Sequence, residues 1–192
     1  MDAGGTSRAA PGPASEPSEV GERLRRLREA RGVSLSALAR AAGIGKATLS
    51  GLEHGTRNPT LETLYAVAGA LGVPLTALVL APGDPPGSAA DVRGAAVTAT
   101  LLEVFSEPQA TFELFWMRVQ PGVVQHSPAH APGVTEHITV HRGVLRTGPG
   151  EAPLVARAGE HVSFRADVPH EYATVGPEEV VANLLIRSPR AL

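Results

Sequence analysis

Residues 34–55 read SLSALARAAGIGKATLSGLEHG, and this stretch decides the first half of the fold. Its first part places four apolar residues at helical spacing: Leu35, Leu38, Ala39 and Ala42. The spacing predicts a short helix with one buried side. Gly43 follows where the chain must reverse, and glycine adopts a positive φ at little steric cost. The stretch therefore predicts two short helices joined by a tight turn.

The second helix of the pair is expected over residues 45–54. Leu49 and Leu52 share its apolar side and are predicted to be buried. The residues predicted to turn outward are small or polar: Lys46, Ala47, Ser50 and Gly51. An outward face of this kind suits a helix that lies on DNA.

The arrangement resembles the helix-turn-helix of the Cro/C1 (XRE) family of phage-repressor-like DNA-binding domains. The resemblance covers residues 19–82 and includes the trailing GTRNPTLETL, which is similar to the family's loop into the next helix. Leu35 stands where many family members carry a glutamine that braces the recognition helix against phosphate. The resemblance implies binding of double-stranded DNA. The pattern alone also allows a small helical bundle that binds protein or nothing.

Apolar stripes on either side of this motif predict further helices. One begins at Glu19, and another follows Pro59 and ends at Gly72. A short last helix is expected over residues 75–80, which completes a bundle of five.

The DNA contacts are expected to divide into base readers and phosphate contacts. Lys46, the only lysine of the chain, is placed to donate to guanine, and Ala47 offers a methyl-sized contact. The expected set is Lys46, Ala47 and Ser50 at base edges, Gly51 at the groove wall, and Arg57, Asn58 and Thr60 on phosphates. Some arginines of the first helix would also neighbour phosphate.

Composition limits the class of protein. The chain has no cysteine, which excludes disulfides and thiolate metal sites. No apolar run is long enough to span a bilayer, and the first residues do not form a secretory signal, so a cytoplasmic protein with no membrane partner is expected. Basic residues outnumber acidic ones over residues 19–82, and the balance reverses after residue 96. Only the first half therefore suits a polyanion.

In the second half of the chain, the spacing of apolar residues changes from helical to alternating. Residues 1–18 are predicted to be a disordered tail and residues 83–95 a linker, because both are rich in small residues and proline. Alternating apolar runs separated by Gly and Pro then predict strands at 97–105, 112–119, 136–141, 144–147, 161–164, 171–175 and 180–187. Residues 96–192 are therefore expected to form an all-β sandwich or small barrel.

Strand parity sorts the polar side chains of this domain. In residues 136–141, EHITVH, the apolar residues share a face with Glu136 and not with His137 or His141. Glu136 is therefore expected inside, and both histidines outside. His170 shares parity with Tyr172 and is expected to point inward. A carboxylate on an apolar inner face is costly unless a metal, a histidine, a tyrosine or a ligand pairs with it.

The spacing of several residues resembles the cupin barrel. Gly122, His130, Glu136 and Gly143 follow its first motif, and Gly159 and His170 follow its second. The resemblance implies a double-stranded β-helix whose metal ligands would be His130, Pro132, Glu136 and His170.

Proline cannot ligate a metal, so Pro132 breaks that set, and Arg165 and Asp167 also depart from the second motif. Two alternatives stay open for His130, Glu136 and His170. They could hold a divalent metal, with His126 as a substitute ligand, or form a metal-free polar cluster in a ligand pocket.

The two resemblances together match the XRE–cupin transcriptional regulators. They imply a homodimer on a near-palindromic operator, with a barrel that binds a small-molecule effector, assists dimerisation, or both. No catalytic residue is predicted. The alternatives are a metal-dependent cupin enzyme, a dioxygenase or isomerase that carries a DNA-binding domain, and a metal-responsive regulator.

Overall fold

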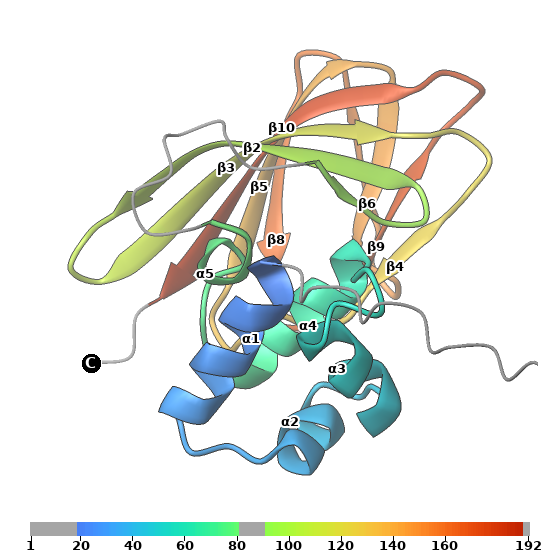
Figure 1. The fold of residues 1–192 in the computed structure, drawn as a ribbon. Coiled ribbons are helices and arrows are strands. Elements are labelled where there is room, and N and C mark those ends of the chain that lie inside the picture. Colours follow the sequence, from blue (N-terminus) through green and yellow to red (C-terminus); the bar gives the residue numbers. More distant parts are fainter. Residues whose placement is uncertain (1–18, 81–90, 190–192) are drawn as a thin grey trace, which may run out of the picture.

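The computed structural model describes residues 19–80 and 91–189 (Figure 1). All helices of these residues come first in the chain and all strands follow. The described helices include none long and apolar enough to cross a membrane. The fold class expected from the sequence, a helical bundle followed by an all-β domain, is confirmed.

Five helices form the first part. They are α1 (Glu19–Ala30), α2 (Leu35–Ala41), α3 (Lys46–Glu53), α4 (Leu61–Leu71) and α5 (Thr76–Val79). Ser34 begins α2, because its hydroxyl accepts a hydrogen bond from the Ala37 N–H at 3.2 Å. Thr60 begins α4 in the same way, and Gly72 ends it in the left-handed conformation with a φ of 65°.

The turn between α2 and α3 is as predicted. Gly43 has a φ of 64°, while Leu38, Leu49 and Leu52 lie in the core. Helix α1 also lies very close to α3. A Cβ atom added at Gly21 would come within 2.2 Å of the Leu52 carbonyl oxygen. Only glycine allows this approach, which the sequence pattern did not reveal.

Two arginines of α1 are not available to DNA. Arg28 donates from Nε and Nη2 to the two carboxylate oxygens of Glu53, at 2.6 and 2.9 Å. Arg23 is buried and donates to the Leu78 carbonyl. Neither is therefore among the arginines of this helix that are expected to neighbour phosphate, since they join α1 to α3 and α5.

The strands form two antiparallel sheets that face each other (Figure 1). The six-stranded sheet has the order β1-β2-β3-β10-β5-β8, and the four-stranded sheet the order β4-β9-β6-β7. The strands are β1 (Val92–Arg93), β2 (Val97–Ser106), β3 (Ala110–Val119), β4 (Gln125–Ser127), β5 (Thr135–Arg142), β6 (Val144–Pro149), β7 (Leu154–Arg157), β8 (His161–Arg165), β9 (His170–Thr174) and β10 (Val180–Pro189).

Each strand predicted from alternation is present, and three short strands, β1, β4 and β7, were missed. Strand β1 lies inside the predicted linker and pairs with β2. The prediction that the linker continues to residue 95 is therefore wrong for β1. Residues 83–90 of that linker, and the predicted tail 1–18, lie outside the described residues.

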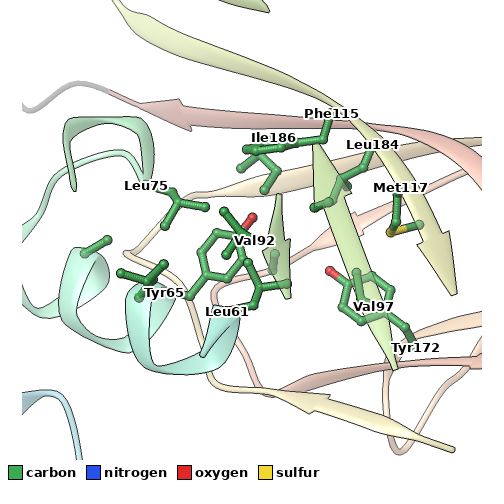
Figure 2. Close-up of a cluster of buried hydrophobic side chains, with 14 of the residues drawn as sticks. Leu61, Tyr65, Leu75, Val92, Val97, Phe115, Met117, Tyr172, Leu184 and Ile186 are labelled. Atoms are coloured by element: carbon green, nitrogen blue, oxygen red, sulfur yellow. The ribbon is translucent and has the colours of Figure 1, made fainter. Parts of the chain in front are cut away.

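The helices are packed against one end of the barrel, with α4 between the strands and the α2–α3 pair (Figure 1). Figure 2 shows Leu61, Tyr65 and Leu75 from the helices beside Phe115, Leu184 and Ile186 from the strands. All six are buried in one continuous apolar core. The two parts of the chain thus share a core instead of meeting at a polar contact.

Candidate functional site

The outward face of α3 is open where a DNA-reading helix needs it. Lys46 and Ala47 are exposed at the start of the helix, and Ser50 is half-buried one turn later. Lys46 and Ser50 share a helix side, because residues four apart are neighbours there. The three predicted base readers therefore form one short surface.

Gly51 differs from the expectation. It is half-buried, and a Cβ atom there would meet side-chain atoms of Thr56 and Arg57 at 3.1 Å. Its carbonyl oxygen accepts hydrogen bonds from the Thr56 and Arg57 backbone N–H groups. The prediction that Gly51 turns outward is thus only partly met. The glycine gives room to the loop that follows α3.

The predicted phosphate contacts lie in the loop from α3 to α4. Arg57, Asn58 and Thr60 are all exposed. Thr60 also caps α4, so its hydroxyl oxygen already accepts the Thr63 N–H at 3.3 Å. The N-terminus of α4 lies at the end of this loop, and the positive end of the helix dipole there suits phosphate.

The second set of predicted residues meets inside the barrel. Glu136 on β5 is fully buried, and its Oε1 lies 2.9 Å from His130 Nε2 and 3.4 Å from His170 Nε2. Each of these three residues offers one possible ligand atom, and the three atoms lie within 4.8 Å of one another. The structure thus brings together the three pocket residues chosen from the sequence.

Three further polar residues surround this triad and were missed as site residues. Tyr172 donates its hydroxyl proton to Glu136 Oε2. Tyr65 of α4 places its ring 4.4 Å from that of His130. Glu113 on β3 is buried and accepts the Thr76 N–H at 2.7 Å. Tyr65 lies on the apolar stripe of the helix predicted after Pro59, and nothing in a single sequence shows that this helix faces a barrel.

The charges of the site follow from these contacts. Burial alone would raise the pKa of Glu136, but contacts with His130 and His170 outweigh it and hold the pKa well below its ordinary value. Burial lowers the pKa of His170, yet the Glu136 carboxylate raises it overall. Glu136 is therefore held as a carboxylate, and its charge favours the protonated form of His170.

The donor set fits a divalent transition-metal ion. Two imidazole nitrogens and one carboxylate are ligands that such ions accept, with further positions left open. His170 Nε2 is buried without a hydrogen-bond partner among the described residues, although it lies near Glu136 Oε1. An ion bound by the triad would satisfy this nitrogen.

The proposed replacement ligand does not join the site. The His126 side chain is 77% exposed and lies beside Glu171, so the expectation that it could substitute is wrong. Pro132 is exposed on the loop after His130. Asp167 accepts the Gly133 N–H at 2.9 Å and pairs with Arg165, so the two departures from the second cupin motif fasten that loop to the barrel.

Comparison with known proteins decides the family. Residues 24–78 match the helix-turn-helix family HTH_3. The chain is 36% identical over 168 residues to the HTH-type transcriptional regulator SutR of Escherichia coli. The match covers 88% of this chain and 94% of SutR. The chain belongs to the HTH-type transcriptional regulators. It is therefore a DNA-binding transcriptional regulator with an XRE-type helix-turn-helix.

Solved structures extend the likeness to both parts of the chain. A crystal structure of an HTH_3 family transcriptional regulator from Vibrio cholerae covers 91% of this chain and 97% of its own, with a TM-score of 0.75 and 28% identity. The Cupin_2 domain of an XRE family regulator from Enterobacter cloacae covers 50% of this chain and 99% of its own, with a TM-score of 0.45 and 28% identity.

Proposed function

We propose that this regulator reads a near-palindromic operator as a homodimer, and that its barrel binds a small-molecule effector around His130, Glu136 and His170. The observation that carries the proposal is the separation of two surfaces. The outward face of α3 is open, whereas the triad is enclosed in the barrel. One surface suits a macromolecule, and the other suits a small ligand. This role places the protein in the cytoplasm with its DNA.

Base reading is assigned to Lys46, Ala47 and Ser50. An ammonium group on the first turn of α3 donates to guanine acceptors in the major groove, and a small alanine allows close approach. Arg57, Asn58 and Thr60 then hold phosphates and fix the register of the helix. Gly51 contributes indirectly, because its missing side chain lets Arg57 pack against α3.

Two copies are needed because a single helix-turn-helix reads one half-site. The outer face of the six-stranded sheet offers an apolar surface for that association. Leu102, Phe105 and Trp116 are exposed on β2 and β3, and Trp116 stacks on His141 at 5.4 Å. The outward histidines of β5 therefore lie at the proposed dimer surface and not at the ligand site.

A divalent metal is the second candidate occupant of the barrel, favoured by the convergence of three ligand atoms on one point. His130, Glu136 and His170 would hold the ion, which would supply a Lewis-acid centre with open positions. A regulator that senses such an ion, and a metal-dependent enzyme that carries a DNA-binding domain, would use the same three residues. The regulators to which the chain is similar favour sensing over catalysis.

The test is selection of bound DNA from a random pool with the full-length protein, with and without Zn(II). Recovery of one site with two-fold symmetry is expected, and the absence of any enriched sequence would overturn the proposal. Zn(II)-dependent recovery that is lost in Glu136→Gln would identify the metal as the effector.

The base-reading assignment has its own test on the selected site. Lys46→Ala should lower affinity for that site by about 10-fold, or about 1.4 kcal/mol, with little change on scrambled DNA. Arg26→Ala on the exposed side of α1 is the matched control for loss of one positive charge. An equal loss on both DNAs would make Lys46 a phosphate contact.

A further inference from the structure

Helix α4 is shared by the two proposed surfaces. Its first end is capped by Thr60, in the loop that we assign to phosphate binding. One side of the helix faces the barrel, where Tyr65 covers His130 and Gly69 lies beside the loop of Ala129 and Ala131. A rigid helix of 11 residues therefore connects the DNA loop to the barrel.

Two carboxylates join the helices to the barrel through polar contacts. Glu113 of β3 accepts hydrogen bonds from Thr76 of α5 and from the Leu75 backbone N–H, and Glu62 of α4 accepts the Ala95 N–H at 3.3 Å. Apolar side chains fill much of the rest of the contact, with Leu75 beside Ile186 (Figure 2). Apolar contacts are not directional, so this arrangement can shift without breaking a large hydrogen-bond network.

A cavity of about 350 Å³ lies within this contact. Its walls come from both parts of the chain, with Ala68, Gly69 and Leu75 on the helix side and Glu113, His130 and Ile186 on the barrel side. The volume falls in the range of roughly 300–1,000 Å³ typical of small-molecule pockets. His130 belongs both to this wall and to the triad, so the cavity adjoins the buried site.

We propose that this cavity is a regulatory ligand site, and that its occupant changes operator affinity by moving α4 on the barrel. The inference rests on the proposed function, which it deepens by naming where the effector acts. A ligand that binds here contacts the DNA-binding part directly. Its affinity therefore differs between docked positions of α4, which is what an effector requires.

The lining indicates the chemistry of the ligand. Ala68, Leu75 and Ile186 form an apolar wall, which favours an aromatic or branched aliphatic body. Glu113 and His130 provide acceptor atoms at the polar end. The ligand is thus a small, largely apolar molecule that carries a hydrogen-bond donor. Tyr65 contributes through its ring, which holds His130 in place.

The first test puts a permanent occupant into the cavity. Gly69→Trp attaches an indole ring to the helix wall of the cavity. Gly69→Ala is the matched control, because it adds no more than a Cβ, which lies at an ordinary contact distance of 3.6 Å from Ala131 N. Operator affinity is measured by fluorescence anisotropy at fixed salt. Gly69→Trp should change the Kd at least fivefold relative to Gly69→Ala. Equal Kd values for the two folded variants would overturn the proposal.

A smaller substitution protects the test against loss of folding. If Gly69→Trp shows no cooperative thermal transition, Gly69→Leu takes its place with the same criterion. The wild-type chain must bind its selected operator in the same assay. Failure of that binding contradicts the proposed function itself. Normal binding by the wild type, with no effect of Gly69→Trp or Gly69→Leu, contradicts only the cavity inference.

The second test uses free indole as the probe, since it is apolar with one N–H donor. Saturation-transfer NMR should detect its binding to the wild type and to Gly69→Ala, and loss of the signal in Gly69→Trp. Saturating indole should also shift operator affinity of the wild type in the same direction as Gly69→Trp. An indole signal that is equal in the two variants would place the binding elsewhere and overturn the inference.

Discussion

Each half of the molecule contains a buried carboxylate, and the two face different kinds of partner: Glu53 in the helical half and Glu136 in the barrel. In the helical half, both oxygens of Glu53 face the guanidinium of Arg28, a cation that does not titrate in proteins. In the barrel, Glu136 faces the imidazoles of His130 and His170 and the hydroxyl of Tyr172. Both side chains are almost completely buried.

The difference separates a structural pair from a binding site. The Arg28 guanidinium uses its donors on Glu53 and on the Val33 carbonyl, so little capacity for another ligand is left. The imidazoles around Glu136 can bind a metal ion together with it instead. A buried carboxylate therefore indicates a site only when its partners can themselves bind a ligand.

The largest expected effect comes from breaking the helical pair. Arg28→Ala leaves Glu53 buried without its cation and should lower the free energy of unfolding by about 3 kcal/mol, the lower end for buried pairs because 12% of the Arg28 side chain is exposed. Urea unfolding followed by circular dichroism measures it. Arg25→Ala removes an exposed arginine of the same helix and should leave the unfolding midpoint unchanged. A similar loss in both variants would contradict the structural role of the pair.

The next effect is in the barrel. Tyr172→Phe removes the hydrogen bond to Glu136 Oε2 and leaves a buried charged acceptor with one partner fewer. The expected loss of stability is about 2 kcal/mol, measured by thermal unfolding. An unchanged midpoint would mean that Oε2 finds another donor.

Replacing the carboxylate itself should cost less than removing its partner. Glu136→Gln keeps an oxygen for Tyr172 and an amide that can donate to His130 Nε2 in the tautomer with its proton on Nδ1, and His170 can become neutral beside it, so a change below about 1 kcal/mol is expected. Glu53→Gln, the same substitution in the helical half, is the matched comparison and should cost several times more, because it leaves Arg28 uncompensated. Equal losses in the same unfolding assay would remove the distinction between the two carboxylates.

The smallest effect concerns a half-buried carboxylate, Asp167. Hydrogen bonds from Arg165 and from the Gly133 N–H lower its pKa to about 2. A lowered pKa stabilises the fold above the ordinary value near 4, and this stabilisation is lost as the pH falls towards 2. The midpoint of thermal unfolding of Asp167→Asn should therefore be slightly lower than that of the wild type at pH 6, and this difference should disappear near pH 2. A gap that persists at pH 2 would assign the effect to shape and not to charge.

Local patterns in the sequence predict much of this structure. Helical spacing placed Leu38, Leu49 and Leu52 in the core, and strand parity placed Glu136 and His170 inside the barrel. These rules succeed because one buried face dictates the period of apolar residues along an element. Parity and the resemblance to the cupin motifs agreed on Glu136 and His170, and the resemblance alone supplied His130.

Contacts between distant elements were not predictable in this way. The pairing of Arg28 with Glu53 joins residues on two helices, and Tyr65 meets His130 across two parts of the chain. Both depend on how finished elements pack, which no local period encodes. Strands β1 and β4 were missed because they have two and three residues, too few to show alternation.

The position of Trp116 has a practical consequence. It is the only tryptophan of the chain, and it lies partly exposed on the outer sheet, stacked on His141. The sequence has thus placed its single strong fluorophore on the proposed association surface, away from α3 and from the barrel interior. Emission from the unmodified protein should shift to shorter wavelength as concentration rises and pairs form, so assembly can be followed with no label.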